Sequence, residues 1–317
     1  MMKIFITGIY GSCASYLAQY ILENYPKAQI HGCVRSINSE KKKNVRDIYQ
    51  YLTLHEYDLT DFESVKSSLK TIKPDIIFNL ASDADVRGSF DHPISTLRNN
   101  IQASHNIFEA VRLLKMNPII KHCSTSEVYG ESETPLIKES NLVRPTNPYA
   151  VSKATQDMLA DVYFSSYQIP IIRTRMFTYI NPRRLNLFAS NFARQIVAIE
   201  RGQTDRLRHG NLDSTRTIID VRDGVRAYWL AVEKGKPGEV YNIGGSNPYK
   251  VGDVLDLLIQ KARTPIKTEV DPSLLRPTDL KYQLPDSSKF ISATGWEPKY
   301  SLDESLDFLL EEFRSND

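Results

Sequence analysis

The sequence has little cysteine and no long apolar run. Its 317 residues include three cysteines, Cys13, Cys33 and Cys123, an odd number at wide spacing with no histidine at ligand distance. This argues against a disulfide framework or a zinc site and indicates a reducing compartment. No run of about 18 apolar residues occurs, and the N-terminal apolar stretch reaches glycine too soon for a signal peptide. We therefore expect a cytoplasmic protein without a bound metal.

A dominant charge of one sign is also missing. The chain has 40 Lys and Arg against 38 Asp and Glu, a formal charge of +2. No global field draws it to nucleic acid or to a membrane, so we expect neither as a partner, and a bound anion needs a local site. The charged run 40–43 is expected to be a solvated loop; the alternative is a wall beside a cofactor phosphate.

What the sequence has, in its first half, is short β-branched or aromatic runs that alternate with amphipathic stretches of helix length. This pattern predicts an α/β fold with a Rossmann-type, doubly wound parallel sheet. After Phe177 prolines interrupt the rhythm, which indicates a smaller C-terminal substrate-binding lobe. We expect the sheet domain to span 1–178, with 215–245 returning to it, and the lobe to comprise 179–214 and 246–317. The predicted strands are 4–7, 30–34, 52–57, 76–80, 119–124 and 171–177, and the predicted helices are 15–25, 62–69, 96–115 and 149–167.

The first strand leads into a glycine-containing turn that opens a helix. Gly8 and Gly11 are three residues apart, and Ala14 stands where a third glycine often occurs. Backbone N–H groups and the dipole at such a helix start can hold a pyrophosphate. The turn predicts a dinucleotide site; the alternative is an ordinary strand-to-helix connection.

The end of the second predicted strand favours NADP as the cofactor. A site for NAD usually has an acidic residue here for the ribose 2′-hydroxyl, but this chain has Arg35, which suits a 2′-phosphate. The alternative is a solvent-exposed arginine. Asp58, after the third strand, is a candidate partner for the adenine amine.

Hydroxyl, phenol and ammonium groups suited to proton transfer follow the fifth strand. Thr125, Ser126 and Glu127 come at its end, and Tyr149 and Lys153 lie four apart on one face of the next predicted helix. The ammonium is expected to lower the pKa of the phenol, which would make Tyr149 a base. These five residues are the candidate catalytic set.

Motifs along nearly the whole chain resemble one family. They are GIYGSCA, NLAS, STSEVYG, YAVSK, HGNLDSTR, DVRD, YNIGG, RPTD and TGWEP. The chain resembles the extended short-chain dehydrogenase/reductases of the nucleotide-sugar epimerase and dehydratase type, and most of all those acting on GDP-mannose and its deoxy-keto product. By this resemblance Thr125, Tyr149 and Lys153 match the family's catalytic Ser/Thr-Tyr-Lys set. The residues expected to contact the cofactor are Gly8, Tyr10, Gly11, Ser12, Cys13, Ala14, Arg35, Asp58, Leu59, Leu80, Ala81, Ser82, Asn100, Tyr149 and Lys153.

The resemblance implies a 4,6-dehydratase that converts GDP-mannose to GDP-4-keto-6-deoxymannose. The steps would be transient oxidation at C4, elimination of water across C5 and C6, and return of hydride to C6, with Glu127 taking the C5 proton. The alternative for Glu127 is a polar residue that only holds its loop. Guanine recognition rests on the resemblance alone.

Three other functions stay open. The segment RPTNPYAVSK and the C-terminal third are as similar to NADPH-dependent GDP-4-keto-6-deoxymannose reductases. A C4 epimerase would share Thr125, Tyr149 and Lys153 without needing Glu127 as a base. A non-catalytic nucleotide-binding homologue is a further alternative, against which the intact catalytic set argues.

The second half offers arginines for the two phosphates of a nucleotide sugar, namely Arg183, Arg184, Arg194, Arg208, Arg216 and Arg276. The alternative for each is a surface arginine. The expected substrate-binding residues are Thr178, Arg183, Asn191, Arg194, Arg216 and Arg276. Thr178 departs from the asparagine that is common in the family. The family's usual pairing through helices 96–115 and 149–167 implies a homodimer or homotetramer.

Overall fold

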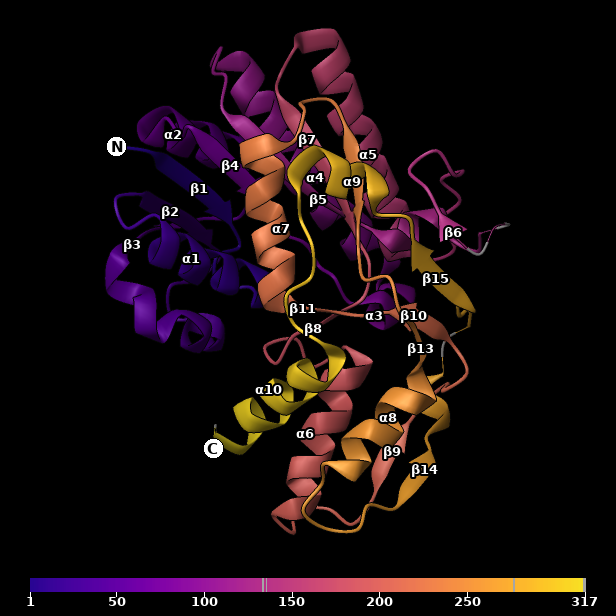
Figure 1. Cartoon of the computed structure of the whole chain (residues 1–317). Helices are drawn as coiled ribbons and strands as arrows, with labels where there is room; N and C mark the ends of the chain where they lie inside the picture. Colours follow the sequence, from indigo (N-terminus) through magenta and orange to yellow (C-terminus); the bar gives the residue numbers. More distant parts are fainter. Residues whose placement is uncertain (133, 135, 276, 316–317) are drawn as a thin grey trace.

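The computed structural model describes residues 1–132, 134, 136–275 and 277–315, and it has an upper body and a lower lobe in the view of Figure 1. The upper body contains a seven-stranded sheet in the order β12-β7-β5-β4-β1-β2-β3. Every neighbouring pair in it is parallel. Its strands are β1 (Lys3–Thr7), β2 (Gln29–Val34), β3 (Leu52–Glu56), β4 (Ile76–Asn79), β5 (Ile119–Thr125), β7 (Ile171–Met176) and β12 (Val240–Ile243).

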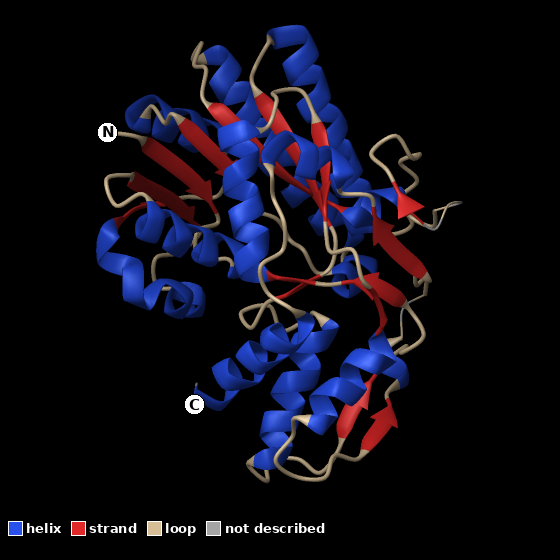
Figure 2. Cartoon of the chain, in the orientation of Figure 1, coloured by secondary structure: helices blue, strands red, loops and turns tan. Residues whose placement is uncertain are grey.

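Helices cover both faces of this sheet, as Figure 2 shows. One face carries α1 (Ser12–Asn24) and α7 (Val221–Lys234), and the other carries α2 (Phe62–Ile72), α4 (Pro93–Leu113) and α5 (Pro148–Tyr167). Because both faces are covered, β1 and β4 are mostly apolar and all four residues of β4 are buried, whereas β5 and β7 also bury polar side chains such as Lys121 and Arg175. The prediction of a Rossmann-type α/β fold with smaller C-terminal sheets is confirmed.

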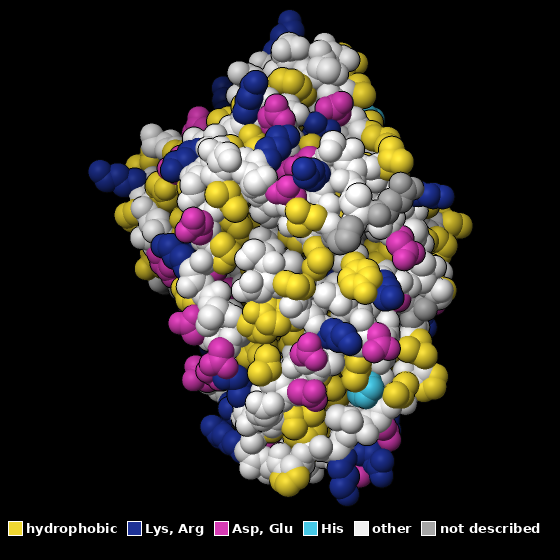
Figure 3. Space-filling model, turned by 45° about the vertical axis from the view of Figure 1, so that its right-hand side comes forward, with side chains coloured by type: hydrophobic (Ala, Val, Ile, Leu, Met, Phe, Trp, Pro, Cys, Tyr) yellow, Lys and Arg dark blue, Asp and Glu magenta, His cyan; other side chains and the backbone are white. Residues whose placement is uncertain are grey.

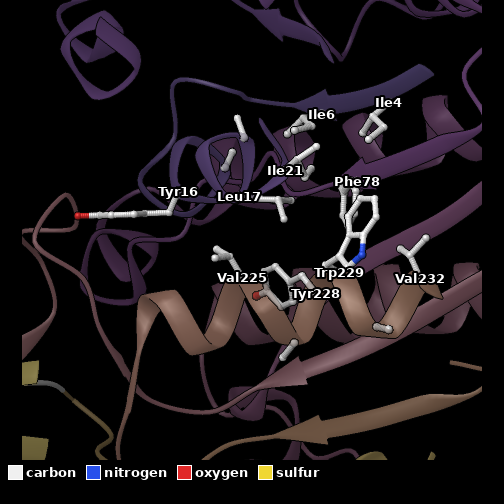
Figure 4. Close-up of a cluster of buried hydrophobic side chains, with 14 of the residues drawn as sticks. Ile4, Ile6, Tyr16, Leu17, Ile21, Phe78, Val225, Tyr228, Trp229 and Val232 are labelled. Atoms are coloured by element: carbon white, nitrogen blue, oxygen red, sulfur yellow. The ribbon is translucent and has the colours of Figure 1, made fainter. Parts of the chain in front are cut away.

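The core between β1, β4, α1 and α7 fixes the helix that begins at the glycine turn. Leu17 and Ile21 of α1 and Trp229 of α7 converge on it, and the ring of Trp229 stacks 6.2 Å from that of Phe78 on β4 (Figure 4). Burying side chains of this size stabilises the fold by about 1.5–3 kcal/mol each. The start of α1 is therefore held in register with the end of β1.

The lower lobe is built from short elements around a core of its own. Helix α6 (Phe188–Glu200) packs against α8 (Val251–Gln260) and α10 (Leu302–Ser315). Three small sheets have the orders β13-β10-β15-β6, β11-β8 and β14-β9. Their strands are β6 (Leu136–Ile137), β8 (Tyr179–Ile180), β9 (Leu207–His209), β10 (Thr215–Thr217), β11 (Ile219–Asp220), β13 (Pro248–Lys250), β14 (Thr268–Val270) and β15 (Tyr282–Pro285). The remaining elements are η1 (Glu40–Tyr51), α3 (Val86–Asp91), η2 (Ser126–Tyr129), η3 (Pro272–Leu274) and α9 (Ser288–Thr294).

Two segments differ from the expected organisation. The charged run 40–43 is not a loop but the start of the 3₁₀ helix η1, which the Ser39 hydroxyl caps and the buried Val45 and Ile48 anchor. Phe290 and Trp296, expected in the lobe, pack into the core of the large sheet. The division into 1–178 with 215–245, and 179–214 with 246–317, stays a prediction.

The surface carries both signs of charge. On the face drawn in Figure 3, basic and acidic side chains lie among apolar ones, in keeping with the net charge of +2. Among the described residues, no helix has the length and apolar character needed to cross a membrane.

A buried histidine in the central strand makes the stability of the fold depend on pH. His122 of β5 is 1% exposed, and its Nδ1 accepts a hydrogen bond of 3.2 Å from Nδ2 of Asn79. Burial lowers the pKa of His122 well below its ordinary 6.5, and the charges of Lys153, Lys121 and Arg173 lower it further. The folded protein thus keeps this imidazole neutral while the unfolded chain protonates it below about pH 6.5.

We predict that the free energy of unfolding falls as the pH drops below about 6.5. Below that pH, His122 binds a proton in the unfolded chain but stays neutral in the folded protein. This one group contributes up to about 1.4 kcal/mol per pH unit. Urea unfolding measures the free energy of unfolding of wild type and His122→Gln between pH 7.5 and pH 5. The slopes of this free energy against pH are compared, so that a uniform loss of stability in the variant cancels. The exposed His92→Gln is the control. Equal slopes in wild type and His122→Gln would contradict the prediction.

Candidate active site

A large cavity lies where the carboxyl ends of the parallel strands face the lower lobe. Its volume is about 2570 Å³, well above the roughly 300–1,000 Å³ of a pocket for one small ligand. Residues that follow β1, β2, β4, β5 and β7 line it, together with lobe residues such as Phe192, His209 and Val251. The cavity has room for a dinucleotide and a second ligand.

The glycine turn forms one end of this cavity. Gly8 has φ +64°, and a Cβ there would stand 3.2 Å from Cβ of Ala81, so a side chain would be both strained and crowded. Helix α1 starts at Ser12 after Gly11, whose position offers no side-chain cap. The backbone N–H groups of this first turn therefore face a cavity with their partial positive charge, as a pyrophosphate requires. The turn lies at the β1/β4 switch point of the sheet.

Fourteen of the fifteen expected cofactor residues line the cavity, and Asn100 does not. The fourteen are Gly8, Tyr10, Gly11, Ser12, Cys13, Ala14, Arg35, Asp58, Leu59, Leu80, Ala81, Ser82, Tyr149 and Lys153. Asn100 is fully buried, and its amide exchanges hydrogen bonds with the backbone of Asp83 and donates to Oγ of Ser152. Asn100 therefore holds the loop after β4 against α5 and acts behind the site.

Arg35 stands at the cavity rim after β2. Its guanidinium lies 3.4 Å from the Asp58 carboxylate and donates a hydrogen bond to Asn99, while its side chain keeps 67% exposure. Burial raises the pKa of Asp58, but hydrogen bonds from Thr60 and the charge of Arg35 lower it by more, so the net shift is downward. The cation at this position is thus accessible from the cavity.

Tyr149 and Thr125 meet at the centre of the cavity wall. Tyr149 is the second residue of α5 and is 6% exposed, and Thr125 ends β5. Burial raises the pKa of Tyr149 above its ordinary 10, whereas the charge of Arg184 and a hydrogen bond with Thr125 lower it. Burial outweighs these two effects, so the pKa of Tyr149 is raised and not lowered as the spacing of Tyr149 and Lys153 predicts.

Lys153 is held by groups other than Tyr149. Its Nζ donates to the carbonyl oxygen of Cys123 at 2.9 Å and to Oε1 of Gln156 at 3.1 Å. Burial lowers the pKa of this ammonium, although Cys123 and Asp157 raise it. The side chain is thereby fixed beside the end of β5 and still lines the cavity.

Glu127 faces the same cavity from η2, one turn beyond Thr125. Oε2 of Glu127 accepts a hydrogen bond of 2.9 Å from Nδ2 of Asn147, and Oδ1 of Asn147 caps α5 by accepting from the N–H of Ala150. One asparagine thus fixes the start of the helix that carries Tyr149 and the orientation of Glu127. Ser126 also lines the cavity, and its buried hydroxyl donates to Oε1 of Gln283 on β15, which lines it too.

The expected substrate residues reach the cavity from the loop after β7 and from the lobe. Thr178, Arg183, Asn191, Arg194 and Arg216 line it, while Arg276 lies outside the described residues. All three of these arginines also make contacts within the protein, and Arg194 donates to Oδ1 of Asn191 at 3.1 Å. Arg183 donates to Oγ of Ser15 at 2.9 Å and stacks on the ring of Tyr16, and Arg216 donates to the carbonyl of Leu280 at 2.8 Å.

Two further residues shape the site beyond the sequence expectations. Arg184, expected only as one of the phosphate arginines, donates to the Tyr179 hydroxyl and to the carbonyl of Ala84, and its charge acts on Tyr149. Asn147 was not among the candidates, although an asparagine directly before a proline is the pattern of a helix start. That pattern could have revealed the cap but not the contact with Glu127.

The fold, the glycine turn and the Thr-Tyr-Lys arrangement define an extended short-chain dehydrogenase/reductase of the nucleotide-sugar epimerase and dehydratase type. Such enzymes bind a nicotinamide dinucleotide. The sequence pattern of one family in this class, GDP-mannose 4,6 dehydratase, matches residues 5–308, so the chain belongs to that family.

Curated relatives and one solved structure agree with this placement. The chain is 29% identical to the GDP-mannose 4,6-dehydratase of Yersinia enterocolitica, over 96% of this chain and 91% of the relative. It is 28% identical to the human dTDP-D-glucose 4,6-dehydratase, over 99% and 90%, and 29% identical to the GDP-6-deoxy-D-mannose reductase of Pseudomonas aeruginosa, over 82% and 87%. The structure of UDP-glucuronic acid 4-epimerase from Bacillus cereus, which holds UDP-glucuronic acid and NAD, superposes with a TM-score of 0.88 at 26% identity, covering 99% of both chains.

We predict that Asn147→Ser lowers the rate of the reaction on the enzyme's nucleotide-sugar substrate by about tenfold, while the melting temperature changes little. Serine is also a good helix cap, so α5 keeps its start, but the amide that orients Glu127 is gone. Asn147→Asp is the stricter variant, because it keeps the cap and places a like charge against Glu127; its turnover should fall further. Turnover and thermal unfolding of all three proteins test this, and full activity in both variants would show that Asn147 does not position Glu127.

Proposed function

We propose that the protein is a GDP-mannose 4,6-dehydratase that uses NADP. The observation that carries the proposal is the joint placement of Thr125, Tyr149 and Glu127 on one cavity wall, with Glu127 oriented by Asn147. A dehydratase needs a base for the sugar hydroxyl and a second acid/base group for the elimination. An epimerase needs only the first.

The first proton transfer is the task of Tyr149. Its phenol takes the proton of the sugar 4-hydroxyl, and the Thr125 hydroxyl hydrogen-bonds the same oxygen. The charge of Arg184 favours the phenolate, which burial disfavours, and Lys153 is fixed beside the end of β5 in the same cavity. The bound nicotinamide supplies a reversible hydride acceptor.

The second proton transfer is the task of Glu127. A ketone at C4 acidifies the proton at C5, and the Glu127 carboxylate takes it. The resulting carboxylic acid then protonates the 6-hydroxyl, which leaves as water. The hydrogen bond from Asn147 keeps the carboxylate aimed into the cavity during both transfers.

The diphosphate of the substrate is assigned to the arginines on the lobe side. Arg216, Arg194 and Arg183 offer guanidinium groups along the cavity, and Thr178 and Asn191 offer polar groups beside them. Guanine as the base is supported by the family pattern and by the GDP-mannose relatives. Arg35 at the end of β2 supports NADP over NAD.

The proposal includes a cytoplasmic homodimer or homotetramer. All three cysteines are free thiols, which suits a reducing compartment. Helices α4 and α5 pack side by side, and α5 exposes Val151, Met158 and Val162 at 40%, 59% and 49%. A second copy would cover this apolar strip.

We predict that the protein converts GDP-mannose in deuterated water, with catalytic NADP and no added NADPH, into a product that has lost one water and gained deuterium at C5. Mass spectrometry reads both changes. Glu127→Gln should slow this dehydration by about 10²-fold or more, and Tyr149→Phe by roughly 10²–10⁴-fold, with cofactor binding retained.

The exposed Glu131→Gln is the matched control and should behave as wild type. Unchanged GDP-mannose with the wild-type protein would overturn the dehydratase. Oxidation of NADPH on addition of GDP-4-keto-6-deoxymannose would then establish the reductase.

We predict that Arg35→Ala weakens NADP binding by about tenfold or more and leaves NAD binding nearly unchanged. The guanidinium would pair with the two negative charges of the 2′-phosphate of NADP, which the 2′-hydroxyl of NAD lacks. Dissociation constants for both dinucleotides, measured by calorimetry, give the ratio, and the exposed Arg144→Ala is the control. A parallel loss for NAD and NADP would refute this role for Arg35.

A further inference from the structure

A buried polar cluster lies behind the catalytic wall and takes no part in the proposed proton transfers. Lys121 and Cys123 are two residues apart on β5, so their side chains share the face that α7 covers. Tyr228 of α7 lies against them, and Figure 4 shows its ring between Val225 and Trp229. Thr125, on the same face, connects this cluster to the active site.

The contacts within the cluster are close. Sγ of Cys123 lies 3.0 Å from the Tyr228 hydroxyl, and Nζ of Lys121 lies 3.0 Å from the centroid of the same ring. Lys121 is 0% exposed, and its Nζ has no hydrogen-bond partner. Burial lowers the pKa of Lys121 to about 8, while the sulfurs of Cys123 and Cys13 raise it. Its ammonium form is therefore favoured only where a negative charge lies near it.

The Cys123 thiol is the group that can supply this negative charge. Burial raises its pKa, but Lys121, Lys153, the Tyr228 hydroxyl and Arg184 lower it by more, so the net shift is downward. Burial instead raises the pKa of Cys13 and of Cys33 to about 12. The groups that face Cys123 are Lys121 on β5, Lys153 on α5, Tyr228 on α7, Cys13 on α1 and Arg184 after β8.

Cys123 is also within reach of solutes. It is partly buried and lines the large cavity, as do Cys13, Tyr228 and Lys153. Its carbonyl oxygen accepts the 2.9 Å hydrogen bond from Lys153. A group added to its sulfur would therefore enter the space between the glycine turn and Lys153.

We propose that Cys123 is a modification site, a thiolate held by Lys121 and Tyr228 that hydroperoxides oxidise and whose oxidation stops catalysis. The thiolate sulfur attacks one oxygen of the peroxide, an S–O bond forms and the O–O bond breaks. The other oxygen leaves with the electron pair and takes up a proton, giving water from hydrogen peroxide. The sulfur is oxidised to a sulfenic acid. One small thiol displaces its oxygen as water to form a mixed disulfide, and a second thiol releases the Cys123 thiolate and leaves as the disulfide of the reductant.

The reactivity of the thiol is tested first, without any assumption about the cofactor. Iodoacetamide is added to the purified full-length protein at pH 7, and mass spectrometry follows alkylation of each cysteine. Cys123 should react at least about tenfold faster than Cys13 and Cys33, since the thiolate is the nucleophile. Lys121→Met should reduce the rate by about tenfold, and Lys121→Arg should keep most of it.

Thermal unfolding shows whether Lys121→Met is folded, and Tyr228→Phe serves in its place if it is not. That variant removes only the hydroxyl beside Sγ and should slow alkylation several-fold. Alkylation of Cys123 in wild type no faster than that of Cys33 would overturn the proposal. An unchanged Cys123 rate in folded Lys121→Met or Tyr228→Phe would overturn the assigned cause.

The consequence for catalysis is tested with hydrogen peroxide and a sulfenic-acid probe. Turnover of the wild type should fall as Cys123 is labelled and recover with dithiothreitol, whereas Cys123→Ser should keep its own untreated activity. This arm rests on the proposed cofactor site, because added NADP should slow the labelling of Cys123. If the probe labels Cys123 rapidly and NADP does not slow the labelling, the reactivity of the thiol is supported and the cofactor assignment is overturned. Loss of activity in Cys123→Ser equal to that of wild type would overturn the regulatory effect.

Discussion

Parallel pairing of β1, β4, β5 and β7 is the constraint on which the rest of the structure depends. In a parallel sheet every strand ends at the same edge, so the turns after these strands must gather there whatever their sequences. The glycine turn, the loop 80–85 and the segment Thr125 to Glu127 become neighbours for this reason alone. The lower lobe then closes the edge, since the segments after β7 and β12 have no further place in the sheet.

The same edge concentrates positive charge at low dielectric. Lys121, Lys153 and Arg184 lower the pKa of Cys123, and Arg184 lowers that of Tyr149, while burial raises both. Burial dominates for Tyr149, whose pKa stays high, while the cations dominate for Cys123. The difference follows from position: the charges of three cations act on the Cys123 thiol, whereas that of Arg184 and a hydrogen bond with Thr125 act on the Tyr149 phenol.

Most of the sheet domain could be predicted from sequence, because a strand covered on both faces must be a short apolar run and its partner helix an amphipathic one. The glycine turn was equally accessible, since Gly8 occupies a conformation that disfavours other residues. The 3₁₀ helix η1 was missed because charged residues 40–43 conceal two buried anchors, Val45 and Ile48.

Some of the site residues could be predicted from sequence and others could not. Tyr149, Lys153 and Thr125 could be found because helix and strand periodicity fixes where they lie. The directions of Arg183, Arg184 and Arg216 could not, because a long side chain chooses among partners that only the tertiary structure brings near, such as Ser15, Tyr179 and Leu280. The position of Asn100 outside the cavity lining has the same origin, as its buried amide joins a loop and a helix distant in sequence.

Glu127 shows how a holding role and a chemical role can coincide. Its carboxylate accepts one hydrogen bond from Asn147, yet an ionised carboxylate offers about four lone-pair sites, so this bond orients the group without exhausting it. A side chain that only held the loop would not need to face the cavity, and a base without an anchor would lose the alignment that proton transfer needs. Because Asn147 also starts the helix that carries Tyr149, the two proton-transfer groups share one anchor and keep a fixed relation to each other.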